Sequence, residues 1–246
     1  IGDAEIKTQE RVIRFFKDPE ILGYQYIGNL SDYQNKNIKE DRLRQYLRLK
    51  GYADKLIDAA VMQLQQEAGN LSRGVYDANK TVYSRLKYGI PVSESPEKPP
   101  VTVELIDEAN PLNNDFAIAE EVTVVEQQEK RPDLVIYLNG IAVAVIELKR
   151  SSISVSEGIR QNLTNQKDSF IRGFFTTMQF CMAGNESEGL RYGTLRTEEK
   201  FYMEWKDDGF KEHEEERDPV DVRISKICKG IENKLLKQIY AMFDKE

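Results

Sequence analysis

The stretch of the chain that most limits its fold is "RPDLVIYLNGIAVAVIELKR", residues 131–150. Two apolar runs, each long enough for a strand, flank Asn139-Gly140. Both residues of this pair tolerate positive φ, so the pair strongly favours a tight hairpin turn. The second run is apolar on both of its faces, which is typical of a strand in the middle of a sheet. The sequence therefore predicts a buried hairpin with charged residues near its open end.

Those charged residues are Asp133, Glu147 and Lys149. Glu147 and Lys149 are two positions apart, so their side chains leave the same face of the second strand. Burying either charge alone is costly, so each needs a partner or a metal ion, and Asp133 could complete the group. Two carboxylates suit a hard cation such as Mg²⁺, for which Mn²⁺ can substitute. Such a metal acidifies a bound water and stabilises negative charge on phosphorus, and Lys149 would orient that water.

This interpretation predicts phosphodiester hydrolysis, and it has a structural alternative. Asp133 could be an ordinary turn or capping residue, and Glu147 with Lys149 could be an ion pair on an edge strand.

The hairpin register decides whether the carboxylates can meet. A strict two-residue turn pairs Leu138 with Ile141 and sets Asp133 opposite Ile146, on the other face from Glu147. The proposed chemistry therefore requires a shift of one residue, through a three-residue loop or a bulge near Asp133. We predict an odd-length turn or a bulge, with both carboxylates and Lys149 facing one cleft.

Composition limits the remaining classes. With 246 residues, 40% of them hydrophobic, the chain can form one large domain with a helical annex. Two cysteines give no disulfide framework or metal spacing, and the single His213 lies in an acidic run, so zinc is not indicated. No signal peptide or membrane-length apolar run is present, which predicts a cytoplasmic protein without membrane contact. The first residue, Ile1, suggests an excised fragment. The net charge of −7 argues against a dedicated DNA-binding module but allows a local basic cleft.

Periodicity divides the chain into four parts. Residues 1–30 contain a short helix behind a Thr8 cap and a strand, and residues 31–100 form a helical annex, with helices broken at Gly51 and ending at Gly89. Residues 101–215 form a β-rich core, and residues 216–246 a helical linker. Within the core the predicted elements are strands at 101–106, 115–125, 134–138 and 141–148, a helix at 154–175 and a strand at 177–184. This order predicts an α/β fold with a mixed central sheet flanked by helices.

The opening stretch resembles the PD-(D/E)xK nuclease motif of the restriction (R) subunit of type I restriction-modification enzymes. Three further blocks resemble the same subunit in the same order: "NPLNNDFAIAEEVTV", "QNLTNQKDSFIRGFF" and "RYGTLRTEEKFYMEWKDDG". The resemblance covers most of the chain. It implies the αβββαβ core of that nuclease superfamily.

The resemblance also implies roles for residues. Asp133 and Glu147 would be metal ligands and Lys149 the catalytic lysine. Relatives often add an acid from the first core helix, for which Glu10 is the candidate and Glu40 or Asp41 an alternative. Gln161 fits the first position of an accessory Gln-x-x-x-Tyr motif, but Asn165 stands where relatives have tyrosine.

Finally, the resemblance implies partners. They are double-stranded DNA, a methyltransferase subunit and a specificity subunit. The resemblance also implies an ATP-driven motor. We expect the motor beyond residue 246, because no G-x-x-x-x-G-K-[ST] loop occurs in this sequence. Basic residues near the proposed site could line a phosphate-binding face, namely Arg150, Arg160, Lys167 and Arg172. Two alternatives remain, a non-catalytic docking module for partner subunits and a PD-(D/E)xK nuclease of a repair system.

Overall fold

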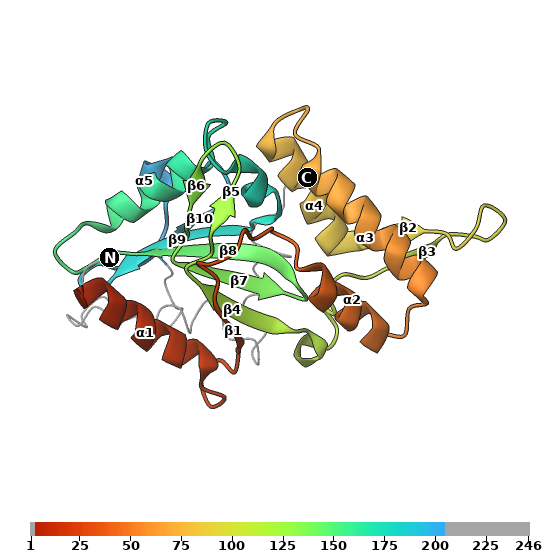
Figure 1. Cartoon of the computed structure of the whole chain (residues 1–246), viewed down its shortest axis with the longest axis horizontal. Coiled ribbons are helices and arrows are strands. Elements are labelled where there is room, and N and C mark those ends of the chain that lie inside the picture. The colour runs from red at the N-terminus through yellow and green to blue at the C-terminus, as the bar shows by residue number, and fades with distance from the viewer. Residues whose placement is uncertain (1–2, 205–246) are drawn as a thin grey trace.

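A six-stranded mixed sheet forms the centre of the computed structural model, which describes residues 3–204 (Figure 1). The strand order is β1-β4-β7-β8-β9-β10. The pairs β1–β4 and β8–β9 are parallel, and the other three neighbouring pairs are antiparallel. The strands are β1 (Gln25–Asn29), β4 (Phe116–Glu120), β7 (Leu134–Leu138), β8 (Ile141–Leu148), β9 (Phe180–Asn185) and β10 (Gly189–Gly193). The predicted α/β fold with a mixed central sheet is confirmed.

The predicted hairpin is the middle of this sheet. Strands β7 and β8 have the bounds expected from the sequence, and every residue in both is buried. Because β8 lies between β7 and β9, it has sheet neighbours on both edges and side chains packed on both faces. This arrangement explains its apolar sequence on both faces and confirms the expectation of a central strand.

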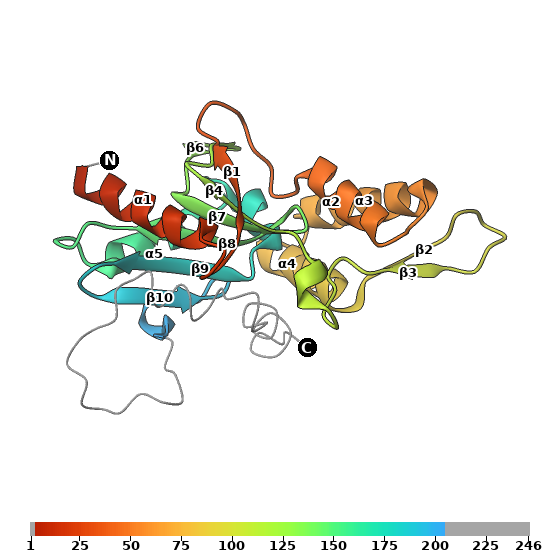
Figure 2. The same cartoon turned by 90° about the horizontal axis from the view of Figure 1, so that it is seen from below.

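Helices cover both faces of the sheet (Figures 1 and 2). Helix α1 (Asp3–Lys17) packs Val12 and Phe16 on the face that includes Ile136 of β7. The opposite face includes Val135 of β7 and is covered by helix α5 (Val155–Asn165) and the 3-10 helix η2 (Arg172–Thr177). Alternate residues of one strand thus enter separate cores, as the two-residue period of a strand requires.

The annex lies beyond the end of the sheet that carries the β7–β8 turn (Figures 1 and 2). Its helices agree with the predicted break at Gly51, which has φ +85°, and with the predicted end at Gly89. A small antiparallel hairpin, β2–β3, projects beside them. The elements are α2 (Glu40–Leu49), α3 (Asp54–Gly69), α4 (Val75–Tyr88), β2 (Ile90–Val92) and β3 (Val101–Val103).

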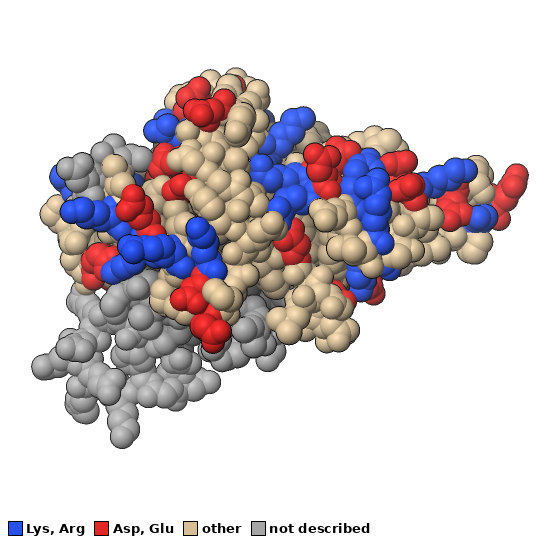
Figure 3. Space-filling model, turned by 60° about the horizontal axis from the view of Figure 1, so that its bottom comes forward, with Lys and Arg blue, Asp and Glu red and all other residues tan. Residues whose placement is uncertain are grey.

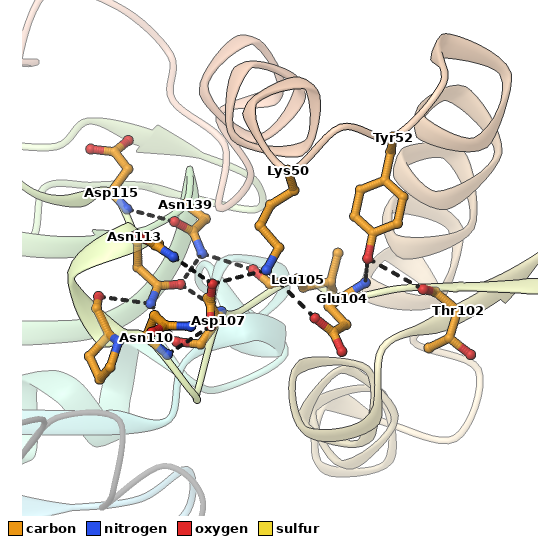
Figure 4. A network of polar contacts seen from close by, with 12 residues as sticks. Lys50, Tyr52, Thr102, Glu104, Leu105, Asp107, Asn110, Asn113, Asp115 and Asn139 are labelled. Atoms are coloured by element: carbon orange, nitrogen blue, oxygen red, sulfur yellow. Dashed lines mark hydrogen bonds and ion pairs between the residues drawn. The ribbon is translucent and has the colours of Figure 1, made fainter.

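A polar network ties the annex to the hairpin turn (Figure 4). Lys50, at the end of α2, places Nζ 2.9 Å from Oδ2 of the buried Asp107. Asn139 of the turn donates from Nδ2 to the carbonyl oxygen of Leu105 and to Oδ1 of Asn114, at 2.9 and 2.8 Å. Burial by itself raises the pKa of Asp107, but hydrogen bonds from its neighbours outweigh it and lower the pKa to about 2. The annex and the core therefore share one buried network of charges and amides.

Several expected elements differ in the structure. Thr8 is a buried residue inside α1 and not its cap, because the helix begins at Asp3. The predicted core strand 101–106 is wrong, since β3 pairs with β2 outside the central sheet. The predicted strand 115–125 is interrupted at Glu121, where φ is +51°. Elements not predicted are β2, β6 (Glu129–Lys130), β10, and the 3-10 helices η1 (Pro111–Asn113) and η3 (Glu199–Phe201), while β5 (Val124–Val125) is the end of the predicted strand.

The expected helix 154–175 also differs, because it divides into α5 and η2. The predicted linker 216–246 and His213 lie outside the described residues.

Candidate active site

The β7–β8 hairpin contains the predicted shift in register, and a bulge produces it. The turn has two residues, Asn139 at φ +51° and Gly140 at φ +83°, and Leu138 lies opposite Ile141. Tyr137 then pairs with Ala142, but Ile136 pairs with Ala144, so Val143 is the additional residue of β8. The bulge is confirmed, and the alternative of an odd-length turn is wrong. The bulge lies beside the turn and not near Asp133.

The bulge brings the two carboxylates together. Beyond it Leu134 pairs with Ile146, so Asp133 comes opposite Glu147 at the open end of the hairpin. The Asp133 carboxylate accepts a hydrogen bond from the backbone N–H of Leu148 at 2.7 Å and interacts with the Glu147 carboxyl group. Asp133 is 8% exposed and Glu147 is 0% exposed. The two acidic groups therefore share one almost buried position at the open end of this central hairpin.

Glu147 cannot readily ionise in this position. Burial raises its pKa well above the ordinary range, and the negative charge of Asp133 raises the pKa further, while Lys149 opposes the shift. Its Oε1 atom is buried and has no hydrogen-bond partner among residues 3–204. A buried carboxyl oxygen without a partner is an expected feature of a site that can accept a cation.

Helix α5 supplies the third member of the site. Nε2 of Gln161 donates to Oε2 of Glu147 at 2.6 Å. The helix reaches this close because Gly158 faces the sheet, where an added Cβ would lie 2.9 Å from Cβ of Ala183 and 3.4 Å from Cβ of Glu147. Gln161 thus contacts Glu147 one turn further along α5. The structure therefore joins this predicted accessory residue to the carboxylates.

Lys149 lies at the same end of the hairpin, directly after β8. Its Nζ atom is 4.0 Å from Oε2 of Glu147 and donates to the carbonyl oxygen of Leu148 at 3.2 Å. Its side chain is 15% exposed and that of Glu147 is 0% exposed, so the lysine is the more solvent-accessible member of this pair. Four of the predicted site residues, Asp133, Glu147, Lys149 and Gln161, are therefore in one cluster.

The other candidate acids differ in position. Glu10 is exposed on α1 and lines a pocket with Glu121 and Arg131, while its buried neighbour Gln9 donates to Glu121. Glu40 binds Arg44 and Gln65 at the start of α2, next to the hairpin turn and so at the opposite end of β8 from Glu147. Asp41 is exposed on the same turn of α2. Neither Glu40 nor Asp41 is part of the cluster.

Glu121 is an acidic neighbour of the cluster that the sequence did not indicate. Its backbone N–H donates to the carbonyl oxygen of Asp133 at 2.8 Å, and its charge contributes to the raised pKa of Glu147. The carboxylate accepts from Nε2 of Gln9 at 3.1 Å and lies 2.9 Å from Nε of Arg131. No feature of the sequence indicates that Glu121 lies beside the cluster, because "AEEVTV" is typical of a strand with solvated acids.

The position where relatives have tyrosine is buried. Asn165 ends α5 and is 2% exposed, and the adjacent Gln166 accepts from the backbone N–H of Arg196 at 2.7 Å. Both amides therefore lie inside the protein under α5.

The basic candidates do not form one positive surface. Arg160 pairs with Glu157 and Glu199, and Arg172 pairs with Asp168. Arg150 and Lys167 are exposed at the ends of β8 and α5. Figure 3 shows Lys and Arg side chains interspersed with Asp and Glu side chains on the face that it presents. A broad phosphate-binding face is therefore not evident from these four residues.

Two features are absent from residues 3–204. No group of three or more His, Cys, Asp or Glu residues there is arranged to hold a metal ion by itself. No helix in the same part of the chain has the length and apolar character needed to cross a bilayer. Any cation at Asp133 and Glu147 would need further oxygen ligands from water, backbone or substrate.

A six-stranded mixed sheet flanked by helices is the architecture of a restriction-endonuclease-like nuclease fold. Residues 5–201 match the family model described as "Type I restriction enzyme R protein N terminus". The chain belongs to this family.

A curated relative agrees with that assignment. The type I restriction enzyme MjaIXP endonuclease subunit of Methanocaldococcus jannaschii is 33% identical over 97 residues, which cover 36% of this chain. The match spans 9% of the length of that relative. The similarity therefore concerns a small part of a much longer protein.

Proposed function

We propose that this domain is the metal-dependent endonuclease of a type I restriction enzyme and hydrolyses phosphodiester bonds of double-stranded DNA. The observation that carries the proposal is the buried pair of Asp133 and Glu147, whose carboxyl groups interact directly. Two such groups placed together repel each other when both are charged, so an ordinary structural role gives no reason for the arrangement. A divalent cation would stabilise both charges.

The residues present fit Mg²⁺, or Mn²⁺ in its place. Both cations prefer oxygen ligands, and Mg²⁺ commonly binds one or two carboxylates, several waters and a phosphate oxygen. Oε1 of Glu147 is a buried oxygen without a hydrogen-bond partner among the described residues, so it is suited to such a contact. When bound, the metal would acidify a water and stabilise negative charge on the phosphate.

The protein residues have separate roles in this proposal. Asp133 and Glu147 hold the cation, and the hydrogen bond from Gln161 fixes the orientation of the Glu147 carboxylate. Lys149 lies within 4.0 Å of Glu147, where its ammonium group can orient the attacking water and offset the charge that develops at phosphorus.

The same proposal extends to the whole enzyme. The 246-residue sequence has no G-x-x-x-x-G-K-[ST] loop, so we assign ATP hydrolysis and DNA translocation to another part of the R protein. We assign DNA recognition and methylation to specificity and methyltransferase subunits. The assembled enzyme would act on DNA in the cytoplasm.

Cleavage of plasmid DNA by the assembled enzyme tests the function. Asp133→Ala, Glu147→Ala and Lys149→Ala should each lower the cleavage rate by about 100-fold or more. ATP hydrolysis should stay near the wild-type rate, because the motor would be a separate part. Asp58→Asn, which changes an exposed carboxylate on α3, is the matched control and should cleave normally.

The outcomes separate the alternatives. A Lys149→Ala enzyme that cuts DNA at the wild-type rate would contradict the catalytic assignment. Variants that cleave normally but fail to assemble with the other subunits would support a docking module.

A further inference from the structure

An ion pair between Glu121 and Arg131 lies directly beside the proposed metal site. Oε2 of Glu121 is 2.9 Å from Nε of Arg131. The two side chains differ in environment, since that of Glu121 is 8% exposed and that of Arg131 is 49% exposed. The buried acid is therefore the fixed member of the pair, and the arginine extends from it toward solvent.

The backbone at Glu121 is held in an uncommon conformation. Its φ of +51° lies in the left-handed region, which costs free energy for a residue other than glycine. The N–H of Glu121 donates to the carbonyl oxygen of Asp133, and its carboxylate accepts from the buried Gln9 of α1. These contacts fix the carboxylate relative to both α1 and Asp133. Strained backbone conformations of this kind are common at functional sites, where a side chain must be placed accurately.

Arg131 is placed so that it can reach a bound phosphate. Only Pro132 separates it from Asp133, so the Cα atoms of the two residues are at most about 7 Å apart. Its side chain lines a pocket of about 370 Å³ together with the amides of Gln9 and Asn29 and the carboxylates of Glu10, Glu120 and Glu121. A guanidinium group carries five N–H donors, more than one carboxylate can use, and its geometry matches a phosphate.

The basic residues on α5 and η2 are less suited to this role. Arg160 and Arg172 are paired with carboxylates near them, and those carboxylates are themselves solvent-accessible. An exposed acid beside an arginine repels a phosphate that approaches it. The side chain of Glu121, the acid that holds Arg131, is instead only 8% exposed, so it is shielded from a phosphate that approaches the arginine.

We propose that Arg131 binds a phosphate of the DNA backbone next to the scissile bond and that Glu121 is the positioning residue that holds it there. The inference rests on the proposed function, because it takes double-stranded DNA to be the substrate. Glu121 acts through Arg131 and not on the metal ion itself.

Binding of the full 246-residue chain to a short DNA duplex tests this inference. Fluorescence anisotropy in EDTA, over a series of salt concentrations, measures affinity without metal binding or cleavage. Arg131→Gln should weaken binding by about tenfold at low salt, as expected for loss of one charge-assisted hydrogen bond. The slope of log K against log salt should fall by about one, because one phosphate contact is lost.

Three further variants sharpen the test. Arg131→Lys keeps the charge, so the salt slope should be retained while affinity falls by several-fold, because the ammonium group lacks the two-pronged geometry. Glu121→Gln removes the ion pair and should weaken binding by about threefold. Arg48→Gln is the matched control, since Arg48 is 57% exposed and ion-paired with Asp54 at the other end of the protein. Its affinity and slope should equal those of the wild type.

The possible results are decisive in both directions. An Arg131→Gln chain with wild-type affinity and salt slope, or a wild-type chain that does not bind the duplex at low salt, would overturn the inference. Melting temperatures show whether each variant is folded, and Arg131→Lys, which retains the ion pair, gives the answer if Arg131→Gln does not fold. A wild-type enzyme that binds DNA through Arg131 but cannot cleave it would contradict the proposed function alone.

Discussion

Replacement of Gly158 by alanine tests the contact between α5 and β8 on which the position of Gln161 depends. The added Cβ would lie 2.9 Å from Cβ of Ala183 and 3.4 Å from Cβ of Glu147. Both neighbours are rigid atoms at the backbone of buried strands, so they cannot rotate away. Helix α5 must move outward instead.

Two opposing effects determine how much Gly158→Ala should destabilise the protein. Alanine is favoured over glycine inside a helix by about 1 kcal/mol. Forcing an extra methyl group into a packed contact costs about 1–3 kcal/mol. We therefore expect a net loss of about 1 kcal/mol in the free energy of unfolding, which corresponds to a fall in Tm of about 2–4 °C for a chain of this size.

The same movement should affect the site. If α5 shifts outward, the 2.6 Å hydrogen bond from Gln161 to Glu147 must lengthen. The variant should therefore bind Mn²⁺ more weakly in calorimetry, and its Tm should be measured by circular dichroism. Gly69→Ala is the matched control, because Gly69 ends α3 and an added Cβ there has no neighbour within 4 Å. It should leave Tm equal or higher. A Gly158→Ala chain that melts at or above the wild-type temperature and binds Mn²⁺ equally well would refute this reasoning.

Three further predictions concern polar groups. Asn139→Ala removes two hydrogen bonds donated by Nδ2 and the one accepted by Oδ1 from the N–H of Asp115. Urea denaturation should therefore show a loss of about 2–4 kcal/mol in the free energy of unfolding, and a loss well below 1 kcal/mol would contradict the role of the network. Because the pKa of Asp107 is lowered from 3.8 to about 2, its contribution to stability should be complete above pH 3.8 and lost as the pH falls toward 2. In thermal melts at several pH values, Asp107→Asn should reduce the acid-dependent loss of unfolding free energy by about 2 kcal/mol. Because the pKa of Glu147 is raised, its contribution to the stability of the metal-free protein should be complete below about pH 4.5 and be lost as the pH rises through the raised pKa. A Glu147→Gln chain with an unchanged pH profile of stability would show that Glu147 is not the cause.

Local sequence patterns predicted the hairpin well. Two apolar runs around Asn139-Gly140 determined the bounds of β7 and β8, because strand length, burial and turn chemistry are all encoded within these residues. The need for the carboxylates to share a face predicted the bulge. Its position could not be predicted, because the carbonyl oxygen of Val143 accepts from the N–H of Gln179, which is distant in the sequence.

Other features depended on tertiary contacts in the same way. The alternating residues 101–103 indicate a strand but do not indicate which strand pairs with it. The position of Glu10 depends on the rotation of α1 against the sheet, and the sequence leaves that rotation open. The contribution of Glu121 depends on a left-handed backbone conformation that its residue type does not signal. Patterns within one element were therefore sufficient for the main hairpin, and the contacts between elements were not.

Calorimetric titration of the chain with Mn²⁺ tests the central claim most directly, because it asks whether the two carboxylates hold a divalent cation. Wild-type protein should bind Mn²⁺ at a single site, with protons released as the raised pKa of Glu147 is reversed. Asp133→Asn should abolish that binding, while Lys149→Ala should retain it, because the lysine is not a ligand. Equal binding of Mn²⁺ by wild type and Asp133→Asn would contradict the account.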